Sequence, residues 1–209
     1  MTLTLAIPTG RIFDETAHLL EECGVALPSS VKEGRRLRIE AGPVTFVLAK
    51  DRDVPTYVEH GVADAGIVGW DVLSEHRPDV YQPLDLGIGA CRMVVARPRE
   101  TEPGFYRDLH LVRVATKYPG AATKHFHGRG IPVEVIPLAG SVELAPVLGL
   151  ADCIVDLVSS GRTLAANGLE VDEVVFESSA RLIVNRASYR LKTDSIRALL
   201  ERLERKRRR

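Results

Sequence analysis

The stretch from residue 153 to residue 166 reads Cys153-Ile-Val-Asp-Leu-Val-Ser-Ser-Gly-Arg-Thr-Leu-Ala-Ala166. Its apolar first part, Cys153 to Val158, predicts a buried strand, and residues 159–163 predict a turn into a helix. Similar short runs rich in Val and Ile alternate with helical patterns along the chain. This order is typical of repeated β-α units over a mostly parallel sheet, so the sequence predicts an α/β fold.

Eight apolar runs are candidate strands because they are short, rich in Val and Ile, and separated by helical or turn patterns. They are Leu3 to Ile7, Val44 to Ala49, Ala65 to Val68, Met93 to Ala96, Leu111 to Ala115, Val133 to Ile136, Cys153 to Val158 and Glu173 to Phe176. A last helix is expected from Asp194 to about Lys206. We expect it to pack back on the first part of the chain, although Leu199, Leu200 and Leu203 could form an oligomer contact instead.

Two prolines, a glycine and mixed charge interrupt this pattern at residues 97–104. An exposed connection between domains has such a composition, so we expect a boundary near it. Residues 1–91 with 180–209 are predicted to form lobe I, and residues 92–179 are predicted to form lobe II. The expected architecture has two lobes with a cleft between them.

Composition places the chain among ordinary globular proteins, because it has 209 residues of which 45% are hydrophobic and 27% are charged. Lys plus Arg and Asp plus Glu number 28 each, so no net field attracts nucleic acid or a membrane surface. The basic tail from Glu201 to Arg209 is expected to be a solvated helix end. The N-terminus lacks signal-peptide features and no segment approaches a membrane span, so we expect a cytoplasmic protein.

The cysteines and histidines do not have metal-ligand spacing. Cys23, Cys91 and Cys153 are far apart and are expected to be reduced thiols. His125 and His127 are two residues apart and would diverge on a helix. This spacing predicts no protein-bound transition metal. A Walker A motif and a full dinucleotide fingerprint are also lacking, so we expect the ligand to be bound by another type of loop.

The loop at residues 159–163 has the chemistry of a phosphate site. Ser159, Ser160 and Thr163 offer hydroxyl groups, and Gly161 lets the backbone approach an anion held by the N–H groups of the turn, which also includes Arg162. Asp156, near the strand end, could accept hydrogen bonds from ribose hydroxyls. The same residue types also form ordinary helix caps and turns, which is the alternative interpretation.

Two loops that follow earlier strands carry candidate cations. Gly10 and Arg11 open the first helix and could hold a diphosphate, although for this segment alone a plain strand-to-helix turn with a surface arginine is the better explanation. Lys50 and Arg52 follow the strand that ends at Ala49. The alternative interpretation of Lys50 and Arg52 is that they belong to a charged, solvated loop.

Two further connections carry groups that could contact a base or a ribose. Gly69, Trp70 and Asp71 follow a buried strand, and Trp70 could flank a flat base, although a single tryptophan is more often a packing residue. Ser141 is a possible helix cap. Glu143 in the first turn could reach a ribose or base, or could simply complement the helix dipole.

Several segments over nearly the whole chain match one family pattern. They are Arg52-Asp-Val-Pro55 with Tyr57-Val58, Gly61 to Gly69, Asp71-Val-Leu73, Ala115-Thr-Lys-Tyr-Pro119, Glu143, Gly149-Leu-Ala-Asp152, Ile154 to Leu164 and Asn167-Gly-Leu169. With these segments the chain resembles the short form of the ATP phosphoribosyltransferases that open histidine biosynthesis.

The resemblance implies a two-lobed α/β fold like that of type II periplasmic binding proteins, with ATP and phosphoribosyl diphosphate bound in the cleft. Mg²⁺ is implied as a cofactor carried mainly by substrate phosphates. Residues 159–163 would hold the 5′-phosphate, Asp156 would lie by the ribose, and Arg11 and Arg52 would act on the leaving diphosphate. The other implied substrate contacts are Gly10, Lys50, Gly69, Trp70, Asp71 and Glu143.

The implied reaction is attack of adenine N1 on C1′ of the sugar, which gives phosphoribosyl-ATP and diphosphate. N1 is already a nucleophile, so a Ser-His or Cys-His pair is not required. One departure concerns Thr9, because the family usually has Lys at this position. Lys50, Arg52 or Arg11 could supply the missing cation.

The family resemblance also implies partners. The chain ends soon after the catalytic region, without the domain through which long-form relatives sense histidine. Short-form relatives use a separate regulatory subunit that resembles histidyl-tRNA synthetase, so a homodimer within a hetero-oligomer is implied.

Two other classes remain as alternatives. A base-salvage phosphoribosyltransferase usually has two adjacent acidic residues before the loop, whereas here Asp156 lies between Val155 and Leu157. A non-enzymatic two-lobed binding protein is disfavoured by the ribose-phosphate loop and by the lack of a signal peptide.

Overall fold

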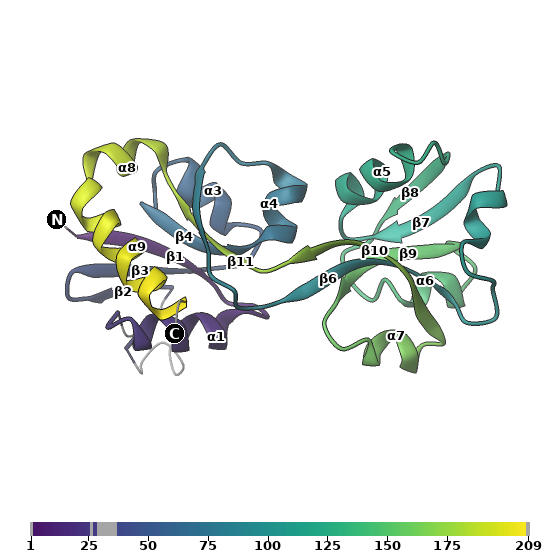
Figure 1. Ribbon diagram of the computed structural model, residues 1–209, viewed down its shortest axis with the longest axis horizontal. Coiled ribbons are helices and arrows are strands. Elements are labelled where there is room, and N and C mark those ends of the chain that lie inside the picture. Colours follow the sequence, from purple (N-terminus) through teal and green to yellow (C-terminus); the bar gives the residue numbers. More distant parts are fainter. Residues whose placement is uncertain (1, 26, 29–36, 208–209) are drawn as a thin grey trace. The chain divides into compact units, whose positions relative to one another are not determined.

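The computed structural model describes residues 2–25, 27–28 and 37–207, which form two compact units (Figure 1). Unit 1 comprises Met1–Ala90 with Ser179–Arg209, and unit 2 comprises Cys91–Ser178. These bounds lie one residue from the predicted lobes. The chain therefore passes between the units at two places.

The prediction of a domain boundary near residues 97–104 is wrong, because this segment lies inside unit 2. Arg97 is only 6% exposed, and its Nε donates to Asp172 Oδ1 at 3.0 Å. The backbone N–H of Gly104 donates to the same carboxylate oxygen at 3.0 Å. A buried ion pair therefore fixes a stretch whose prolines and charges suggested an exposed connection.

Unit 1 contains a six-stranded sheet with the order β2-β3-β1-β4-β11-β5. Its strands are β1 (Leu3–Pro8), β2 (Arg38–Ala41), β3 (Val44–Ala49), β4 (Ala65–Gly69), β5 (Tyr81–Asp85) and β11 (Ala180–Val184). Its helices are α1 (Phe13–Glu22), α3 (Val54–Glu59), α4 (Trp70–His76), α8 (Arg186–Leu191) and α9 (Thr193–Arg207).

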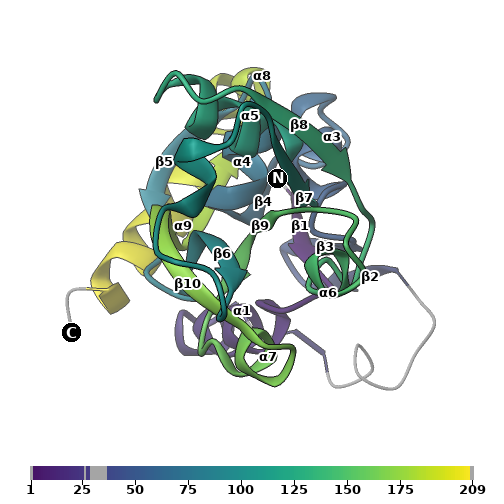
Figure 2. The ribbon, with the colours of Figure 1, turned by 90° about the vertical axis from the view of Figure 1, so that its right-hand side faces the viewer.

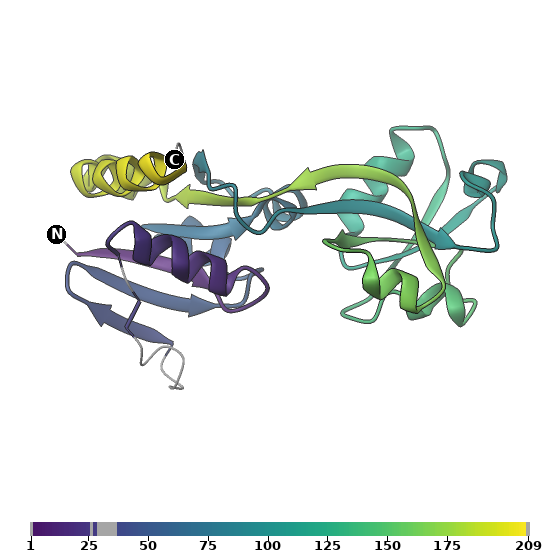
Figure 3. The same ribbon diagram turned by 60° about the horizontal axis from the view of Figure 1, so that its bottom comes forward.

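Helices cover both faces of this sheet. On one face α1 and α9 lie next to each other and share a core that includes Leu20, Leu199 and Phe46 (Figure 3). On the other face α3 and α4 pack on the sheet through Val54, Val58, Val72 and Leu73. The sheet is thus buried on both sides, which explains why its central strands read as continuous apolar runs.

The last helix packs back on unit 1, as expected. Ile196, Leu199 and Leu203 of α9 are buried in the core of unit 1, and Leu200 is partly buried against it. The alternative that Leu199, Leu200 and Leu203 form an oligomer contact is therefore wrong, because the helix uses this apolar face to cover its own sheet.

Unit 2 contains a five-stranded sheet with the order β10-β6-β9-β7-β8. Its strands are β6 (Cys91–Pro98), β7 (Val112–Thr116), β8 (Val133–Pro137), β9 (Cys153–Val158) and β10 (Leu169–Ser178). Its helices are the 3₁₀ helix η1 (Phe105–Asp108), α5 (Pro119–His127), α6 (Leu144–Val147) and α7 (Arg162–Ala166).

This second sheet also separates two layers of helices, and Figure 2 shows α5 and α7 on opposite sides of its strands. Phe126 of α5 and Tyr106 of η1 pack with Val155 on one face. Ala145 of α6 and Leu164 of α7 pack with Ile154 on the other face. Successive residues of β9 therefore enter different cores, as the two-residue period of a strand requires.

The expectation of mostly parallel sheets is wrong, because both sheets are mixed. The parallel pairs are β1–β3, β1–β4, β7–β8 and β7–β9, and the other described pairs are antiparallel. Three strands that the sequence did not suggest, β2, β5 and β11, each pair antiparallel with a neighbour. β2 and β5 are short edge strands with several exposed residues, so they lack a strong apolar pattern.

Among the described residues, no helix combines the length and the apolar character that crossing a bilayer requires.

Candidate active site

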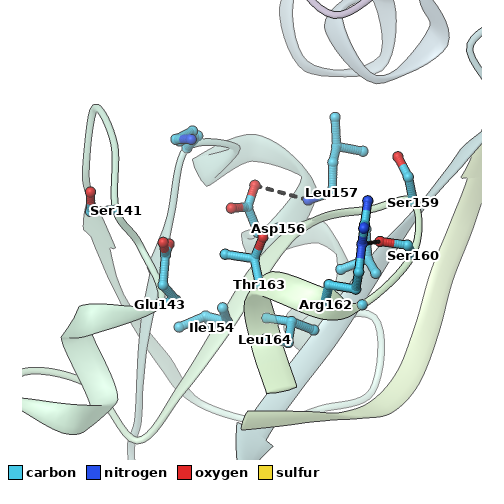
Figure 4. Close-up of a pocket in the computed structure, with 13 residues that line it drawn as sticks. Ser141, Glu143, Ile154, Asp156, Leu157, Ser159, Ser160, Arg162, Thr163 and Leu164 are labelled. Atoms are coloured by element: carbon cyan, nitrogen blue, oxygen red, sulfur yellow. Dashed lines mark hydrogen bonds between the residues drawn. The ribbon is translucent and has the colours of Figure 1, made fainter. Parts of the chain in front are cut away.

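A cavity of about 320 Å³ lies in unit 2 at the carboxyl end of β9 (Figure 4). Its lining residues come from the end of β9, the following loop, the start of α7, and the segments before α5 and α6. They are Lys117, Ser141, Glu143, Ile154, Asp156, Leu157, Val158, Ser159, Ser160, Gly161, Arg162, Thr163 and Leu164. The cavity therefore gathers the predicted phosphate loop, Asp156 and Glu143 in one place.

The loop folds as a sharp turn because Gly161 has a φ of 74°, in the left-handed region. A Cβ at Gly161 would find open space, with Val158 Cγ1 nearest at 3.9 Å. Glycine is thus required here for its backbone conformation and not for lack of room. The turn starts α7 and places Arg162 and Thr163 at the cavity, where Arg162 Nε donates to Ser160 Oγ at 3.3 Å.

Asp156 lies on the α6/α7 face of the sheet because its neighbours at even positions, Ile154 and Val158, belong to that core. The backbone N–H of Leu157 donates to Asp156 Oδ1 at 2.8 Å. Burial raises the pKa of Asp156 and the nearby Glu143 carboxylate raises it further, while this N–H and the Lys117 ammonium lower it. The Asp156 carboxylate is thus partly desolvated in a cavity that is also lined by the positively charged Lys117 side chain.

Ser141 and Glu143 reach the cavity from the segment before α6. The prediction that Ser141 caps this helix is not borne out, because α6 has Glu143 at its N-cap position and has no side-chain cap hydrogen bond. Ser141 instead has a φ of 47°, an uncommon conformation for a residue with a side chain. The Glu143 side chain lines the cavity together with Asp156, which favours ligand contact over a simple dipole effect (Figure 4).

An ion pair supports the turn that joins α6 to β9. Arg113 of β7 donates from Nη2 to Asp152 Oδ1 at 2.7 Å and from Nη1 to the Gly149 carbonyl at 3.0 Å. The Arg113 backbone N–H donates to Asp152 Oδ2 at 2.8 Å. These contacts account for the Gly149-Leu-Ala-Asp152 segment as a structural support next to the cavity.

The other predicted residues lie in unit 1, at the carboxyl ends of its parallel strands. Gly10 follows β1, Lys50 and Arg52 follow β3, and Gly69, Trp70 and Asp71 lie at the junction of β4 and α4. These strand ends are adjacent because β1 pairs in parallel with both β3 and β4. The structure thus gathers the strand-end residues of unit 1, while the phosphate loop belongs to unit 2.

Asp51 is a residue of this unit 1 group that the sequence did not single out. A Cβ at Gly10 would lie 2.5 Å from Asp51 Oδ1, so the carboxylate occupies the space that glycine leaves. Burial raises the pKa of Asp51, and the Asp71 charge raises it further, whereas the Gly10 N–H and Arg11 lower it. Asp71 is itself only 4% exposed.

Arg11 donates from Nη1 to the carbonyl of Gly89 at 2.8 Å, and the Gly89 N–H donates to Glu15 Oε2 at 2.8 Å. Arg11 thus contacts the loop after β5, and its side chain is also exposed to solvent. Lys50 and Arg52 are exposed as well. Trp70 is half-buried, and the Arg181 guanidinium lies 5.6 Å from its ring centre, so this tryptophan has a packing partner.

Lys117 is the second residue that the sequence did not single out as a site residue. It lines the cavity from the end of β7, next to Asp156. The available signal was its place in Ala115-Thr-Lys-Tyr-Pro119, directly after a predicted strand. The order of the strands in the sheet decides which strand ends lie next to each other, and this order cannot be deduced from a single sequence.

The described residues contain no group of three or more His, Cys, Asp and Glu side chains arranged to hold a metal ion. His125, on α5, is buried and bonds through Nε2 to Glu173 Oε1 at 2.8 Å. Cys23, Cys91 and Cys153 are free thiols.

Comparison with known proteins agrees with this architecture. A probable amino-acid ABC transporter extracellular-binding protein, ytmK from Bacillus subtilis, covers 98% of this chain and 95% of its own with a TM-score of 0.60 and 17% identity. At that identity the likeness concerns the fold alone. It identifies a two-unit α/β architecture of the binding-protein type.

Closer relatives identify the family. The HisG family model, described as ATP phosphoribosyltransferase, matches residues 50–205. An ATP phosphoribosyltransferase from Rubrobacter xylanophilus is 50% identical over 201 residues, which is 95% of this chain and 93% of that protein. A solved chain of the ATP phosphoribosyl transferase (HisG:HisZ) complex from Thermotoga maritima has a TM-score of 0.84 and 36% identity, with 98% of each chain covered. This chain therefore belongs to the ATP phosphoribosyltransferase family, the enzymes that open histidine biosynthesis.

Proposed function

We propose that this ATP phosphoribosyltransferase binds the ribose 5-phosphate part of phosphoribosyl diphosphate in the cavity of unit 2. The observation that carries the proposal is the common lining of this cavity by Asp156, Glu143 and residues 159–163. A carboxylate suits ribose hydroxyls, and a tight turn with hydroxyl side chains suits a phosphate. Both parts of the ligand thus find matching groups in one cavity.

Within this site Ser159, Ser160 and Thr163 contact the 5′-phosphate together with the N–H groups of the turn. Asp156 accepts hydrogen bonds from the ribose hydroxyls, and Glu143 lies near enough to influence its charge. These contacts fix the sugar so that C1′ faces the incoming adenine. Correct alignment of two reactants supplies a large part of the rate enhancement in such a transfer.

The reaction requires no enzyme nucleophile. Adenine N1 of ATP forms a bond to C1′ while the bond from C1′ to the diphosphate oxygen breaks, and the diphosphate leaves with the electron pair. Arg11 and Arg52 are assigned to the growing charge on the diphosphate. Gly10, Lys50, Gly69, Trp70 and Asp71 are the remaining substrate contacts.

The described residues offer no group of three or more His, Cys, Asp and Glu ligands for a metal ion, and we propose that Mg²⁺ would be carried mainly by the substrate phosphates. When bound, the ion neutralises charge on the departing diphosphate.

Thr9 replaces the lysine usual in the family, and its hydroxyl donates to the carbonyl of Ala49 at 3.2 Å. This contact ties the end of β1 to the end of β3 and supplies no charge. We therefore assign the cation role at the diphosphate to Arg11 and Arg52, with Lys50 as an additional positive group.

Formation of phosphoribosyl-ATP tests the proposal. The purified chain is incubated with ATP, phosphoribosyl diphosphate and Mg²⁺, with a diphosphatase to pull the equilibrium, and product absorbance is followed. We expect turnover with ATP and none with free adenine or a free pyrimidine. Turnover with a free base alone would instead identify a salvage enzyme.

Substitutions test the placement of the sugar phosphate. Asp156→Ala and Thr163→Val should each raise the KM for phosphoribosyl diphosphate about tenfold or more, because each removes a hydrogen bond to a charged or buried group. The KM for ATP should change much less. Asp108→Ala, which removes an exposed carboxylate of the same unit, is the control. Equal small effects on both substrates would mean that the loop is only structural.

We also propose that the chain assembles as a homodimer within a hetero-oligomer, and that it acts in the cytoplasm. The support for the hetero-oligomer is the Thermotoga maritima relative, which is named as a HisG:HisZ complex. The implied partner is a regulatory subunit that resembles histidyl-tRNA synthetase. Measurement of the mass of the chain alone and after addition of such a subunit tests the assembly.

A further inference from the structure

We propose that Lys117 is a positioning residue of the phosphoribosyl diphosphate site, where it lines the cavity from the strand next to Asp156, the group proposed to accept hydrogen bonds from the ribose. The inference rests on the proposed function of the unit 2 cavity. It adds a residue and a role to that site.

Strand register brings the two side chains together. β7 and β9 are parallel neighbours, and Thr116 is aligned with Val155. The next residues in the same register are Lys117 and Asp156. Both therefore stand at the carboxyl ends of adjacent parallel strands, where ligands of α/β proteins bind.

The side chains also share one face of the sheet. Ala115 belongs to the core on the α6/α7 face, so Lys117, two residues later, is directed to that same face. Asp156 is on this face because Ile154 and Val158 are in the same core. Both residues line the cavity.

Thr116 fixes the backbone that carries Lys117. Its hydroxyl donates to the carbonyl of Val155 at 2.6 Å and accepts a hydrogen bond from the Tyr118 N–H at 2.8 Å. Thr116 is fully buried. Thr116 is thus bonded to β9 and Tyr118 is bonded to Thr116, so the backbone on both sides of Lys117 is held next to β9.

The charges in the cavity explain why a cation is needed there. Asp156 and Glu143 are two carboxylates in one cavity, and the substrate adds further negative charge. Burial and Glu143 both raise the pKa of Asp156, whereas Lys117 and the Leu157 N–H lower it. Arg162 is the other cation among the lining residues, and its Nε donates to Ser160 Oγ.

A protonated Asp156 would offer one hydroxyl donor and lose acceptor capacity, so it would bind vicinal hydroxyls less well. An opposite charge nearby typically lowers a carboxyl pKa by about one unit or more. Lys117 thus keeps the site competent at pH values where burial and Glu143 would otherwise favour the protonated acid.

The test compares Lys117→Met, Lys117→Arg and the control Lys124→Met, an exposed lysine on α5 that does not line the cavity. The dissociation constant for phosphoribosyl diphosphate and its KM are measured from pH 5 to pH 8. In Lys117→Met the acidic fall in affinity should move up by about one pH unit. Lys117→Arg should restore the wild-type profile, and the substrate's own titration is common to all variants.

A second arm uses Asp156→Asn, in which the group under study cannot ionise. Lys117→Met added to this variant should leave the pH profile unchanged. The inference is overturned if Lys117→Met keeps the wild-type profile, or if it weakens ATP and phosphoribosyl diphosphate binding equally. Should Lys117→Met fail to fold, a wild-type profile in Lys117→Gln would overturn it instead.

The same experiments test the proposed function independently of the role of Lys117. If Asp156→Ala and Thr163→Val leave the KM for phosphoribosyl diphosphate unchanged, the cavity is not the sugar-phosphate site. If those two variants weaken binding while Lys117→Met does not shift the profile, only the role of Lys117 is wrong.

Discussion

Gly161 shows how one backbone angle can shape a ligand site. Its φ of 74° turns the chain from β9 into α7 and places Arg162 and Thr163 at the cavity. Gly168, at the other end of α7, has a φ of 70° and does not line the cavity. The two glycines therefore differ in their position relative to the cavity but not in the backbone conformation that they require.

Alanine at either position should destabilise the protein to a similar degree, by about 1 kcal/mol, because both need the left-handed conformation. Only Gly161→Ala should also raise the KM for phosphoribosyl diphosphate, since only that turn contacts the proposed phosphate. Urea unfolding and steady-state kinetics on both variants measure the two effects. A matching rise in KM for Gly168→Ala would refute the special role of the loop.

The side chain of Asp64 links three segments of unit 1 and is 5% exposed. Its Oδ2 accepts from the Thr4 N–H at 2.8 Å and from Lys192 Nζ at 2.7 Å, and its Oδ1 accepts from Ser188 Oγ at 2.7 Å. Burial alone would raise its pKa, but these bonds outweigh burial and lower the pKa of Asp64. The carboxylate thus stabilises the fold at neutral pH.

Asp64→Asn should lower the free energy of unfolding by about 1.5 to 3 kcal/mol at pH 7, the range for hydrogen bonds to a charged group. The wild-type contribution is present above the unfolded-state pKa of about 3.9 and is lost as pH falls through the lower folded-state pKa. The control is Asp79→Asn, which breaks the exposed Arg186 pair and should cost little. Urea unfolding between pH 3 and pH 7 provides the measurement, and equal losses in both variants would contradict the assignment.

At the scale of elements, α5 is joined to β10 through a buried histidine. Arg129 Nη1 donates to His125 Nδ1 at 3.0 Å, and His125 Nε2 donates to Glu173 Oε1 at 2.8 Å. Tyr106 of η1 donates its hydroxyl to the same Glu173 oxygen at 2.7 Å. The arrangement needs a neutral imidazole, because a proton on Nδ1 would face the Arg129 guanidinium.

Burial lowers the pKa of His125, although Glu173 acts in the opposite direction. The unfolded state therefore binds a proton at higher pH than the folded state, and stability should fall as pH drops below about 6.5 toward the folded-state pKa. His125→Gln should flatten this part of the pH dependence, whereas exposed His127→Gln should not. Thermal unfolding at pH 7.5, 6.5 and 5.5 distinguishes them, and identical slopes in wild type and His125→Gln would count against this account.

The predictability of each element follows from its burial. β3 and β9 have the bounds that the sequence predicts, because each is an apolar run packed on both faces. β10 extends from Leu169 to Ser178, well beyond the predicted core at residues 173–176. Acidic residues such as Asp172 and Glu173 belong to this strand, where Arg97 and His125 pair with them. Charge pairs of this kind conceal a strand from a search for apolar runs.

At the scale of the whole molecule, the family relationship leads to a prediction about regulation. Histidine should inhibit only after addition of the partner subunit, because in the hetero-oligomer that we propose the regulatory subunit supplies the response to histidine. Kinetics with and without the partner, at increasing histidine concentration, measure this effect. Strong inhibition of the isolated chain would overturn the short-form assignment.

Residues that lie close together along the chain were sufficient to establish the α/β class and the family, and to suggest the loop that we propose as the ribose 5-phosphate site. The loop from Asp156 to Thr163 carries strand, acid, turn and helix in one segment, so its local order is sufficient to recognise it.

The strand order, the mixed direction of the sheets and the neighbours of each loop became known from the three-dimensional structure. Lys117 stands beside Asp156 because β7 and β9 are adjacent and in register, although 39 residues separate Thr116 from Val155. Asp51 meets Gly10 because β3 pairs with β1. Such contacts depend on long-range pairing between strands, which composition and periodicity within a segment do not encode.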